Sequence, residues 1–144
     1  MRSCYTVDPD LRLLQPGDEN VVRALRTYEG DGDPEGLLAD PRTLMLVAFD
    51  AELPVGLVLA HELPRRHGDR AKLFVYEIDV AESHQRRGIA KALLARLAEI
   101  ALERGVRVGF VLTEPDNDAG NALYASAGGT SHTDVMWTFR YTDD

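Results

Sequence analysis

Gln85-Arg86-Arg87-Gly88-Ile89-Ala90 is the most informative segment of this sequence. It follows residues 73–80 (LFVYEIDV), a run of mostly β-forming side chains, and it opens residues 89–104, where apolar side chains recur at helical spacing. A strand that turns through a short loop into a helix brings free backbone N–H groups and the positive end of the helix dipole to one place. The stretch therefore predicts an anion-binding loop between a strand and a helix.

The composition of this loop favours a phosphate as the anion. A glycine lets the backbone approach a phosphate closely, and Gly88 is followed by the small residue Ala90. Formal positive charge comes from Arg86, Arg87 and Lys91. No Gly-Lys-Ser/Thr follows the glycine and no Gly-x-Gly-x-x-Gly is present, so the loop matches neither a nucleoside triphosphate loop nor a dinucleotide fingerprint.

The loop resembles the acyl-CoA pyrophosphate loop of the GNAT N-acetyltransferases. That pattern is Gln or Arg, any two residues, Gly, any residue, and Gly or Ala. Gln85, Gly88 and Ala90 fit it. Because the pattern is short, it needs support from its structural context.

A second signature of the same family follows downstream. It consists of a strand, an Asn, a Tyr seven residues later in a short helix, and then a Gly. Residues 108–112 (VGFVL) read as the strand, and Asn117, Tyr124 and Gly128 follow at this spacing. Two motifs in the family's order make the resemblance strong over about half of the chain, roughly from Phe74 to Tyr141.

Three segments look like one branch of the family, the aminoglycoside 3-N-acetyltransferases. They are residues 75–80 (VYEIDV), 84–90 (HQRRGIA) and 135–139 (VMWTF). The N-terminal half, which largely sets the substrate in this superfamily, resembles the branch far less clearly.

The resemblance implies an α/β fold, with a mixed, mostly antiparallel sheet of about seven strands flanked by about four helices. From the residues we expect strands at 10–14, 44–49, 54–63, 72–80, 108–112 and 134–141. We expect helices from Pro16 and Asp18 to about Tyr28, at 35–39, at 89–104, and from Asn117 or Asp118 to the pair Gly128-Gly129. No linker or repeat appears, so residues 1–144 are expected to form one GNAT domain.

The resemblance also implies how a thioester would be held. Tyr124 matches the tyrosine that the family places against the CoA sulfur, and it is our candidate general acid for the leaving thiolate. Ile78 and Val80 match the positions where the family's strand parts from its neighbour and offers backbone groups to the pantetheine arm, with the Val80 N–H as the expected oxyanion donor. The expected cofactor contacts are Ile78, Val80, Gln85, Arg86, Arg87, Gly88, Ala90, Lys91 and Asn117.

Two groups of carboxylates are candidates for binding and deprotonating an amine. Glu77 and Asp79 share one face of their strand because side chains alternate, so we expect them to line the groove where the amine enters, with Glu77 as the candidate base. Glu114 and Asp116 lie at or beyond the end of the next strand and are the second candidate base and cation site. A polar loop with a helix cap explains the second group equally well.

Composition excludes several other classes of function. The net charge of −8 argues against nucleic acid as a partner and is compatible with a small cationic amine. A single cysteine, no basic-then-apolar leader and only short apolar runs predict a cytoplasmic protein without membrane association. No His/Cys cluster has the spacing of metal ligands, so we expect no metal.

The sequence thus predicts an enzyme that moves an acetyl group from acetyl-CoA to a primary amine, first of all the 3-amino group of an aminoglycoside. The alternatives are acetylation of another small amine, a polyamine or a peptide amino group, and a non-catalytic module that senses acyl-CoA. The resemblance also leaves room for a homodimer, since dimers are common in the family.

Overall fold

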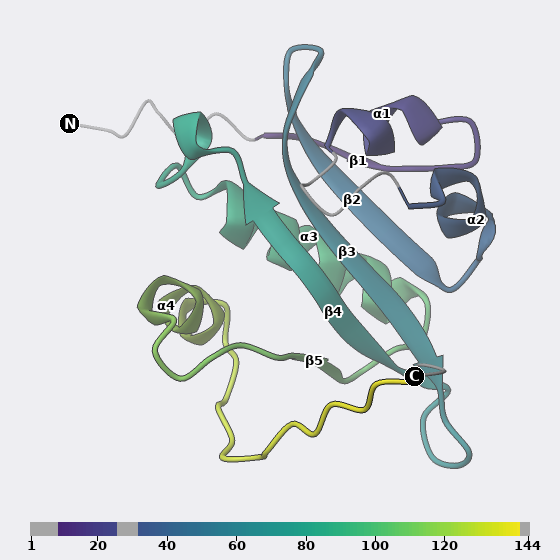
Figure 1. Ribbon diagram of the computed structural model, residues 1–144, viewed down its shortest axis with the longest axis vertical. Coiled ribbons are helices and arrows are strands. Elements are labelled where there is room, and N and C mark those ends of the chain that lie inside the picture. Colours follow the sequence, from purple (N-terminus) through teal and green to yellow (C-terminus); the bar gives the residue numbers. More distant parts are fainter. Residues whose placement is uncertain (1–8, 26–31, 142–144) are drawn as a thin grey trace.

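One sheet of five strands runs through the described part of the chain. The computed structural model describes residues 9–25 and 32–141, and the strand order within them is β1-β2-β3-β4-β5 (Figure 1). Neighbouring strands are antiparallel except β4 and β5, which are parallel. The strands are β1 (Asp10–Leu13), β2 (Thr43–Asp50), β3 (Leu53–Pro64), β4 (Ala71–Val80) and β5 (Gly109–Val111). The helices are α1 (Glu19–Ala24), α2 (Pro34–Ala39), α3 (Ile89–Glu103) and α4 (Asp118–Ser126), with a short 3-10 helix, η1 (Glu82–His84).

Helices cover both faces of the sheet at β2 and β3. These two strands are nearly continuous apolar runs whose side chains are buried on both faces. On one face, α1 and α2 pack against a cluster that includes Met45 and Val47 (Figure 1). On the other face, α3 packs against a cluster that includes Leu44 and Leu46. The alternation along β2 therefore divides its side chains between two apolar layers.

The apolar stripe of α3 is the one that its sequence spacing predicts. Ile89, Leu93, Leu97 and Ile100 are all buried against the sheet. The helix ends just before Gly105, whose φ of 77° is the left-handed conformation that glycine adopts without strain. The long helix is thus held along its whole length, and the loop that precedes it is attached to a fixed element.

β4 is fully paired on one side and barely paired on the other. It pairs with β3 along its length, but with β5 only at residues 73–75. The β3–β4 register shifts at this point: Leu59 lies opposite Glu77 and Ala60 opposite Val75, which leaves Tyr76 as the extra residue of a β-bulge. Beyond Val75, the backbone of β4 on the β5 side is therefore left without a strand neighbour.

Two expectations about secondary structure are wrong for the described residues. Residues 134–141 form no strand, so the sheet described has five strands rather than about seven. A strand is maintained by hydrogen bonds to a neighbour, and residues 130–141 pair with none of the described strands. The first helix begins at Glu19 rather than at Pro16, because residues 16–17 form a turn in which Gly17 has a φ of 111°. Its expected end near Tyr28 lies outside the described residues.

One buried carboxylate is the centre of a network that joins four parts of the fold. The Glu62 side chain is 1% exposed and accepts hydrogen bonds from Arg104 and, at 2.7 Å, from Arg70. Arg104 also donates to the carbonyl oxygen of Pro41 at 2.6 Å, so the network joins β3, the β3–β4 hairpin, the end of α3 and the turn before β2. Burial raises the pKa of Glu62, but the hydrogen bonds from Arg104 and Arg70 outweigh it and hold the pKa below its ordinary value.

Glu62→Ala is expected to lower the free energy of unfolding at pH 7 by about 1–3 kcal/mol, because two guanidinium groups lose a buried, charged acceptor. Since the folded-state pKa is depressed, the contribution of Glu62 is present above its unfolded pKa, near 4.5, and is lost as the pH falls through the folded value. Urea denaturation at pH 7 and at acidic pH measures both effects. Glu99→Ala removes the exposed partner of Arg96 and is the control. Equal losses for the two variants would contradict the assignment.

Candidate functional site

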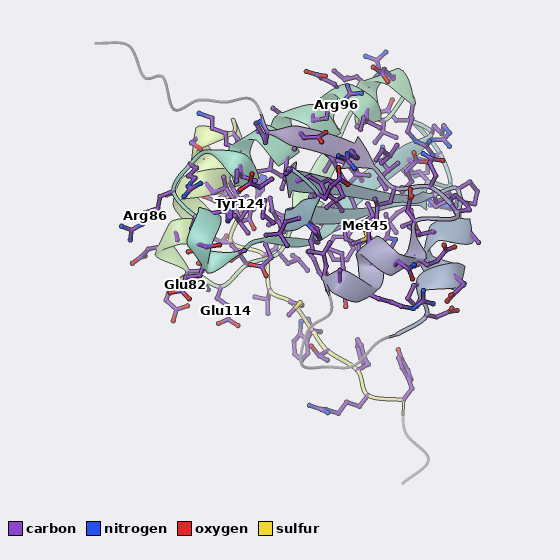
Figure 2. The ribbon with its side chains drawn as sticks, turned by 90° about the horizontal axis from the view of Figure 1, so that it is seen from above. Met45, Glu82, Arg86, Arg96, Glu114 and Tyr124 are labelled. Atoms are coloured by element: carbon purple, nitrogen blue, oxygen red, sulfur yellow. The ribbon has the colours of Figure 1, made fainter. Side chains whose placement is uncertain are left out.

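The predicted anion loop lies between the end of β4 and the start of α3. Gly88 is the N-cap of α3, with a φ of 80° and no side-chain cap, so the N–H groups of the first helical turn are open. A Cβ at Gly88 would meet nothing within 4 Å, and glycine is required here by the left-handed backbone rather than by crowding. Arg86 also has a positive φ, of 63°, and its side chain points away from the body of the molecule (Figure 2). This geometry suits an anion that arrives from solvent.

His84 connects this loop to the β2–β3 hairpin. Its Nδ1 lies 2.7 Å from the Ser83 hydroxyl, and its Nε2 lies 2.8 Å from Asp50 Oδ2. The neutral tautomer that satisfies both contacts carries its proton on Nε2. The His84 side chain is only 13% exposed, although it belongs to a surface loop. His84 therefore fixes where the loop begins.

Val80 ends β4 with both of its backbone polar groups turned away from β3. Its N–H donates to Asp79 Oδ1 at 2.9 Å, and its carbonyl oxygen accepts from Gln85 Nε2 at 3.0 Å. Backbone groups of an antiparallel strand repeat their direction at every second residue, so those of Ile78 face the same side as those of Val80. This is the side on which β5 has already parted from β4.

Asn117 sets the start of α4 and thereby the direction of Tyr124. Its Oδ1 accepts from the N–H of Gly120 at 3.1 Å, and its Nδ2 donates to Thr113 Oγ1 at 2.8 Å. A spacing of seven residues is about two helical turns, so Tyr124 lies on the same side of α4 as the cap. The seven-residue spacing of the motif therefore places the Asn117 cap and the Tyr124 side chain on the same face of α4.

A first hollow of about 350 Å³ opens on the face of the sheet that carries α1 and α2. Glu77 and Asp79 both line it, which places the two expected carboxylates together. The bulge at Tyr76 contributes here, because Tyr76 and Glu77 are both exposed while Ile78 turns back toward the core. Other polar side chains in its lining are Tyr76, Thr113, Asn117 and Tyr124.

The second group of expected carboxylates lies elsewhere. Glu114 and Asp116 are exposed and are not among the residues that line the first hollow. Figure 2 shows Glu114 at the outer edge of the molecule. Their loop is held through its backbone, since Asn121 Nδ2 donates to the carbonyl oxygen of Glu114 at 3.2 Å. Of the two groups, only Glu77 and Asp79 share a concave surface with Tyr124.

A second hollow of about 640 Å³ lies on the opposite face, along α3. Its lining runs from Lys91 at the start of α3 to Leu102 near its end, with β5 and the end of α4 on the other sides. Lys91 and Leu102 are eleven positions apart on the helix, which corresponds to a rise of about 17 Å. The hollow is therefore an elongated, largely apolar groove, with Lys91 at the end near the anion loop and Arg107 just beyond the other end of α3.

Tyr124 lies where the two hollows meet. It lines both of them, and so does Val111 at the end of β5. Burial raises the pKa of Tyr124 above its ordinary value, so the phenol keeps its proton at neutral pH. Tyr124 and Val111 are therefore residues that a molecule in either hollow would contact.

Some residues of the candidate site could not be identified from the sequence. Tyr76, Thr113 and the Asp50–His84 pair were not identified as site residues, because a bulge and a contact between distant loops leave no local signal. Within residues 9–25 and 32–141, no three His, Cys, Asp or Glu side chains are placed to hold a metal ion. None of the helices described is long and apolar enough to cross a membrane.

Comparison with known proteins gives a family and several relatives. The sequence profile of the acetyltransferase (GNAT) family matches residues 11–128. Streptothricin acetyltransferase from Streptomyces lavendulae is 28% identical over 118 residues, which are 82% of this chain and 55% of that protein. The chain thus spans about half the length of this curated relative.

Solved structures extend the comparison. An aminoglycoside acetyltransferase from an uncultured soil metagenomic sample matches with a TM-score of 0.82 and 24% identity, over 94% of this chain and 100% of that chain. The ribosomal-protein-alanine N-acetyltransferase of Brucella melitensis biovar Abortus 2308 matches with a TM-score of 0.75 and 27% identity, over 92% and 98% of the two chains. The aminoglycoside N-acetyltransferase AAC(6')-Iy, solved with CoA, matches with a TM-score of 0.77 and 21% identity, over 92% and 99%. The first and third of these structures share less than 25% of their sequence with this chain, so they show similarity of fold alone.

Proposed function

Because the chain belongs to the acetyltransferase (GNAT) family, we propose that it moves an acetyl group from acetyl-CoA to a primary amine. The observation that carries the proposal is the meeting of two hollows at Tyr124, from opposite faces of the sheet. One hollow is lined by Lys91, in the first turn of α3 directly after the anion loop, and the other by Glu77 and Asp79. An anionic thioester and a cationic amine would thus approach the same phenol from opposite sides.

The cofactor side of the proposal rests on the donor set of the loop. The open N–H groups after Gly88 would receive the pyrophosphate of acetyl-CoA, with charge from Arg86, Arg87 and Lys91. Ala90 keeps the first turn narrow and Gln85 braces the loop through the carbonyl oxygen of Val80. The pantetheine arm would follow the side of β4 that β5 leaves open, at Ile78 and Val80. Asn117 acts through α4, since both ends of its amide are already bonded.

The chemistry needs a base, an oxyanion donor and a proton for sulfur. The amine nitrogen attacks the carbonyl carbon of the thioester, and the C–S bond breaks as the oxyanion collapses. The Val80 N–H stabilises the oxyanion once it exchanges its present acceptor, the Asp79 carboxylate, for that oxygen. Glu77 accepts the proton of the amine, directly or through water, and Tyr124 gives its proton to the thiolate.

The substrate we propose is an aminoglycoside, acetylated at the 3-amino group as the sequence resemblance indicates. Two carboxylates in one hollow suit a molecule with several ammonium groups. The similarity to streptothricin acetyltransferase makes streptothricin the first alternative. The AAC(6') name of one structural neighbour makes the 6′ amino group the alternative position. Polyamines and peptide amino groups remain further candidates within the same chemistry.

Gly88→Glu is expected to weaken acetyl-CoA binding by at least about tenfold, because a carboxylate would stand at the pyrophosphate site. Gly105→Glu is the matched control: Gly105 has nearly the same φ (77° against 80°) and the same open surroundings, but it lies at the other end of α3. Both variants carry the same backbone strain, so a difference in their affinity for CoA, measured by isothermal titration, reports the effect of the carboxylate at the loop. Equal affinities for the two variants would refute the loop assignment.

Tyr124→Phe is expected to lower kcat by about 10²–10⁴-fold, because the thiolate loses its proton donor, while the Kd for CoA stays unchanged. Tyr76→Phe removes the other phenol hydroxyl of the first hollow and should leave kcat nearly unchanged. Thiol release measures turnover and titration measures the Kd. A chain that only senses acyl-CoA would release no thiol in either form, and a Tyr124→Phe enzyme as fast as its parent would reject the general-acid role.

Glu77→Gln is expected to raise the KM for the amine by about tenfold and to leave the KM for acetyl-CoA unchanged, because an ammonium loses its charged acceptor. Glu114→Gln is the matched control, since its carboxylate lies outside the hollow. Initial rates with each substrate varied in turn separate the two constants. A larger effect at Glu114 would move the amine site to the β5–α4 loop.

A further inference from the structure

A cluster of aromatic rings crosses the sheet beside the first hollow. His61 on β3, Phe74 and Tyr76 on β4, and Phe110 on β5 form an unbroken series of contacts. The distances between ring centroids are 5.9 Å for His61–Tyr76, 5.7 Å for Phe74–Tyr76 and 4.9 Å for Phe74–Phe110. Of these residues, Tyr76 lines the first hollow. None of the rings takes part in the proposed proton transfers, so the cluster needs another explanation.

The neighbouring rings fix the orientation of Tyr76. Phe74 and His61 meet it at interplanar angles of 89° and 68°, the edge-to-face arrangement that the charge distribution of aromatic rings favours. His61 Nδ1 lies 3.3 Å from Thr43 Oγ1, and Phe74 is stacked on Phe110 at 8°. Even so, Tyr76 is 59% exposed. The ring is therefore ordered before a ligand arrives, which lowers the entropy cost of binding to it.

Tyr76 owes its position to the bulge and to the separation of the strands. Val75 and Val111 are the last pair of β4 and β5, and Tyr76 and Leu112 follow it directly on the two strands (Figure 1). Both of these side chains line the first hollow, and both are more than half exposed. Because Tyr76 is the extra residue of the bulge, its neighbour Glu77 lines the same hollow. The hollow thus combines an open aromatic ring with a carboxylate on adjacent residues.

This combination suits an amine that is carried on a saturated ring. The face of a phenol ring has partial negative charge, and it attracts ammonium groups and C–H groups that are polarised by a neighbouring nitrogen or oxygen. A rigid ring presents several such C–H groups on one face, whereas an open-chain amine must first be ordered bond by bond. Glu77 and Asp79 are available for the ammonium groups at the ring's edge.

We propose that Tyr76 binds a saturated ring of the substrate and makes the first hollow selective for amines carried on such rings, namely aminosugars and aminocyclitols. The inference rests on the proposed function and narrows its substrate class. The ring of the substrate lies against the Tyr76 ring, and its ammonium groups reach Glu77 and Asp79. Open-chain polyamines use the carboxylates alone and bind more weakly. Tyr76 contributes through its ring rather than through its hydroxyl.

Two ligands of equal charge test the selectivity. Neamine and spermine carry the same number of amino groups, on rings in neamine and on an open chain in spermine. Isothermal titration is carried out with the parent protein, Tyr76→Leu and Tyr76→Phe. The parent is expected to bind neamine more tightly than spermine. Tyr76→Leu should weaken neamine binding by about three- to tenfold and leave spermine binding unchanged, because only the ring ligand loses a stacking partner.

The conservative variant and a distant ring are the controls. Tyr76→Phe keeps the ring and should retain the affinity of the parent for neamine. Phe139→Leu removes an exposed ring that does not line the first hollow and should change neither affinity. Since Tyr76 is largely exposed, Tyr76→Leu should unfold at nearly the same temperature as the parent, which a thermal melt checks.

Several results would overturn the proposal. Equal losses for neamine and spermine in Tyr76→Leu would mean that the residue acts through the fold or the carboxylates. Equal losses in Tyr76→Leu and Tyr76→Phe would assign the effect to the hydroxyl. A parent that binds spermine as tightly as neamine, or binds neither, would show that the hollow does not select rings.

Thiol release from acetyl-CoA, measured with the same ligands, separates this inference from the proposed function. Tyr76→Leu is expected to raise the KM for neamine by the same factor as its Kd and to leave the KM for acetyl-CoA unchanged. Ring-selective binding without thiol release for any amine would support the role of Tyr76 and reject the proposed function. Thiol release from neamine that is indifferent to Tyr76→Leu would reject the role of Tyr76 and leave the proposed function in place.

Discussion

The separation of β4 from β5 beyond Val75 determines where the candidate site can lie. β4 is bonded to β3 along its length but to β5 only at residues 73–75, and the Tyr76 bulge lies directly after this paired segment. If β5 continued beside β4, the backbone N–H and C=O groups of Ile78 and Val80 would be hydrogen-bonded to it within the sheet. The parted strands instead leave an open backbone edge that reaches from the anion loop to Tyr124.

The bulge and the parting act together on side chains as well. One extra residue reverses the alternation, so that Ile78 and Val80 pack toward α3 while Glu77 and Asp79 face the first hollow. Positive charge lies at one end of the site and negative charge at the other, within a chain whose net charge is −8. Asp79 Oδ1 accepts a hydrogen bond from the Val80 N–H, the group that we propose as the oxyanion donor.

Local elements could be predicted from the sequence because their causes are local. The spacing of Ile89, Leu93, Leu97 and Ile100 determines the buried face of α3, and Asn117 caps α4 where the motif indicates. The bulge at Tyr76 could not be predicted, since it depends on the register with β3. The His84–Asp50 contact joins residues 34 positions apart, which no local pattern encodes. Residues 134–141 have the pattern of a strand, but a pattern does not supply the neighbour that a strand needs.

We propose that the two hollows that meet at Tyr124 form an acetyl-transfer site. The most direct measurement is thiol release from acetyl-CoA by the purified protein, with aminoglycosides, streptothricin, polyamines and simple amines offered in turn and each product identified by mass. We expect release with a polycationic amine and a product heavier by one acetyl group. Tight binding of CoA without release for any amine would contradict this proposal.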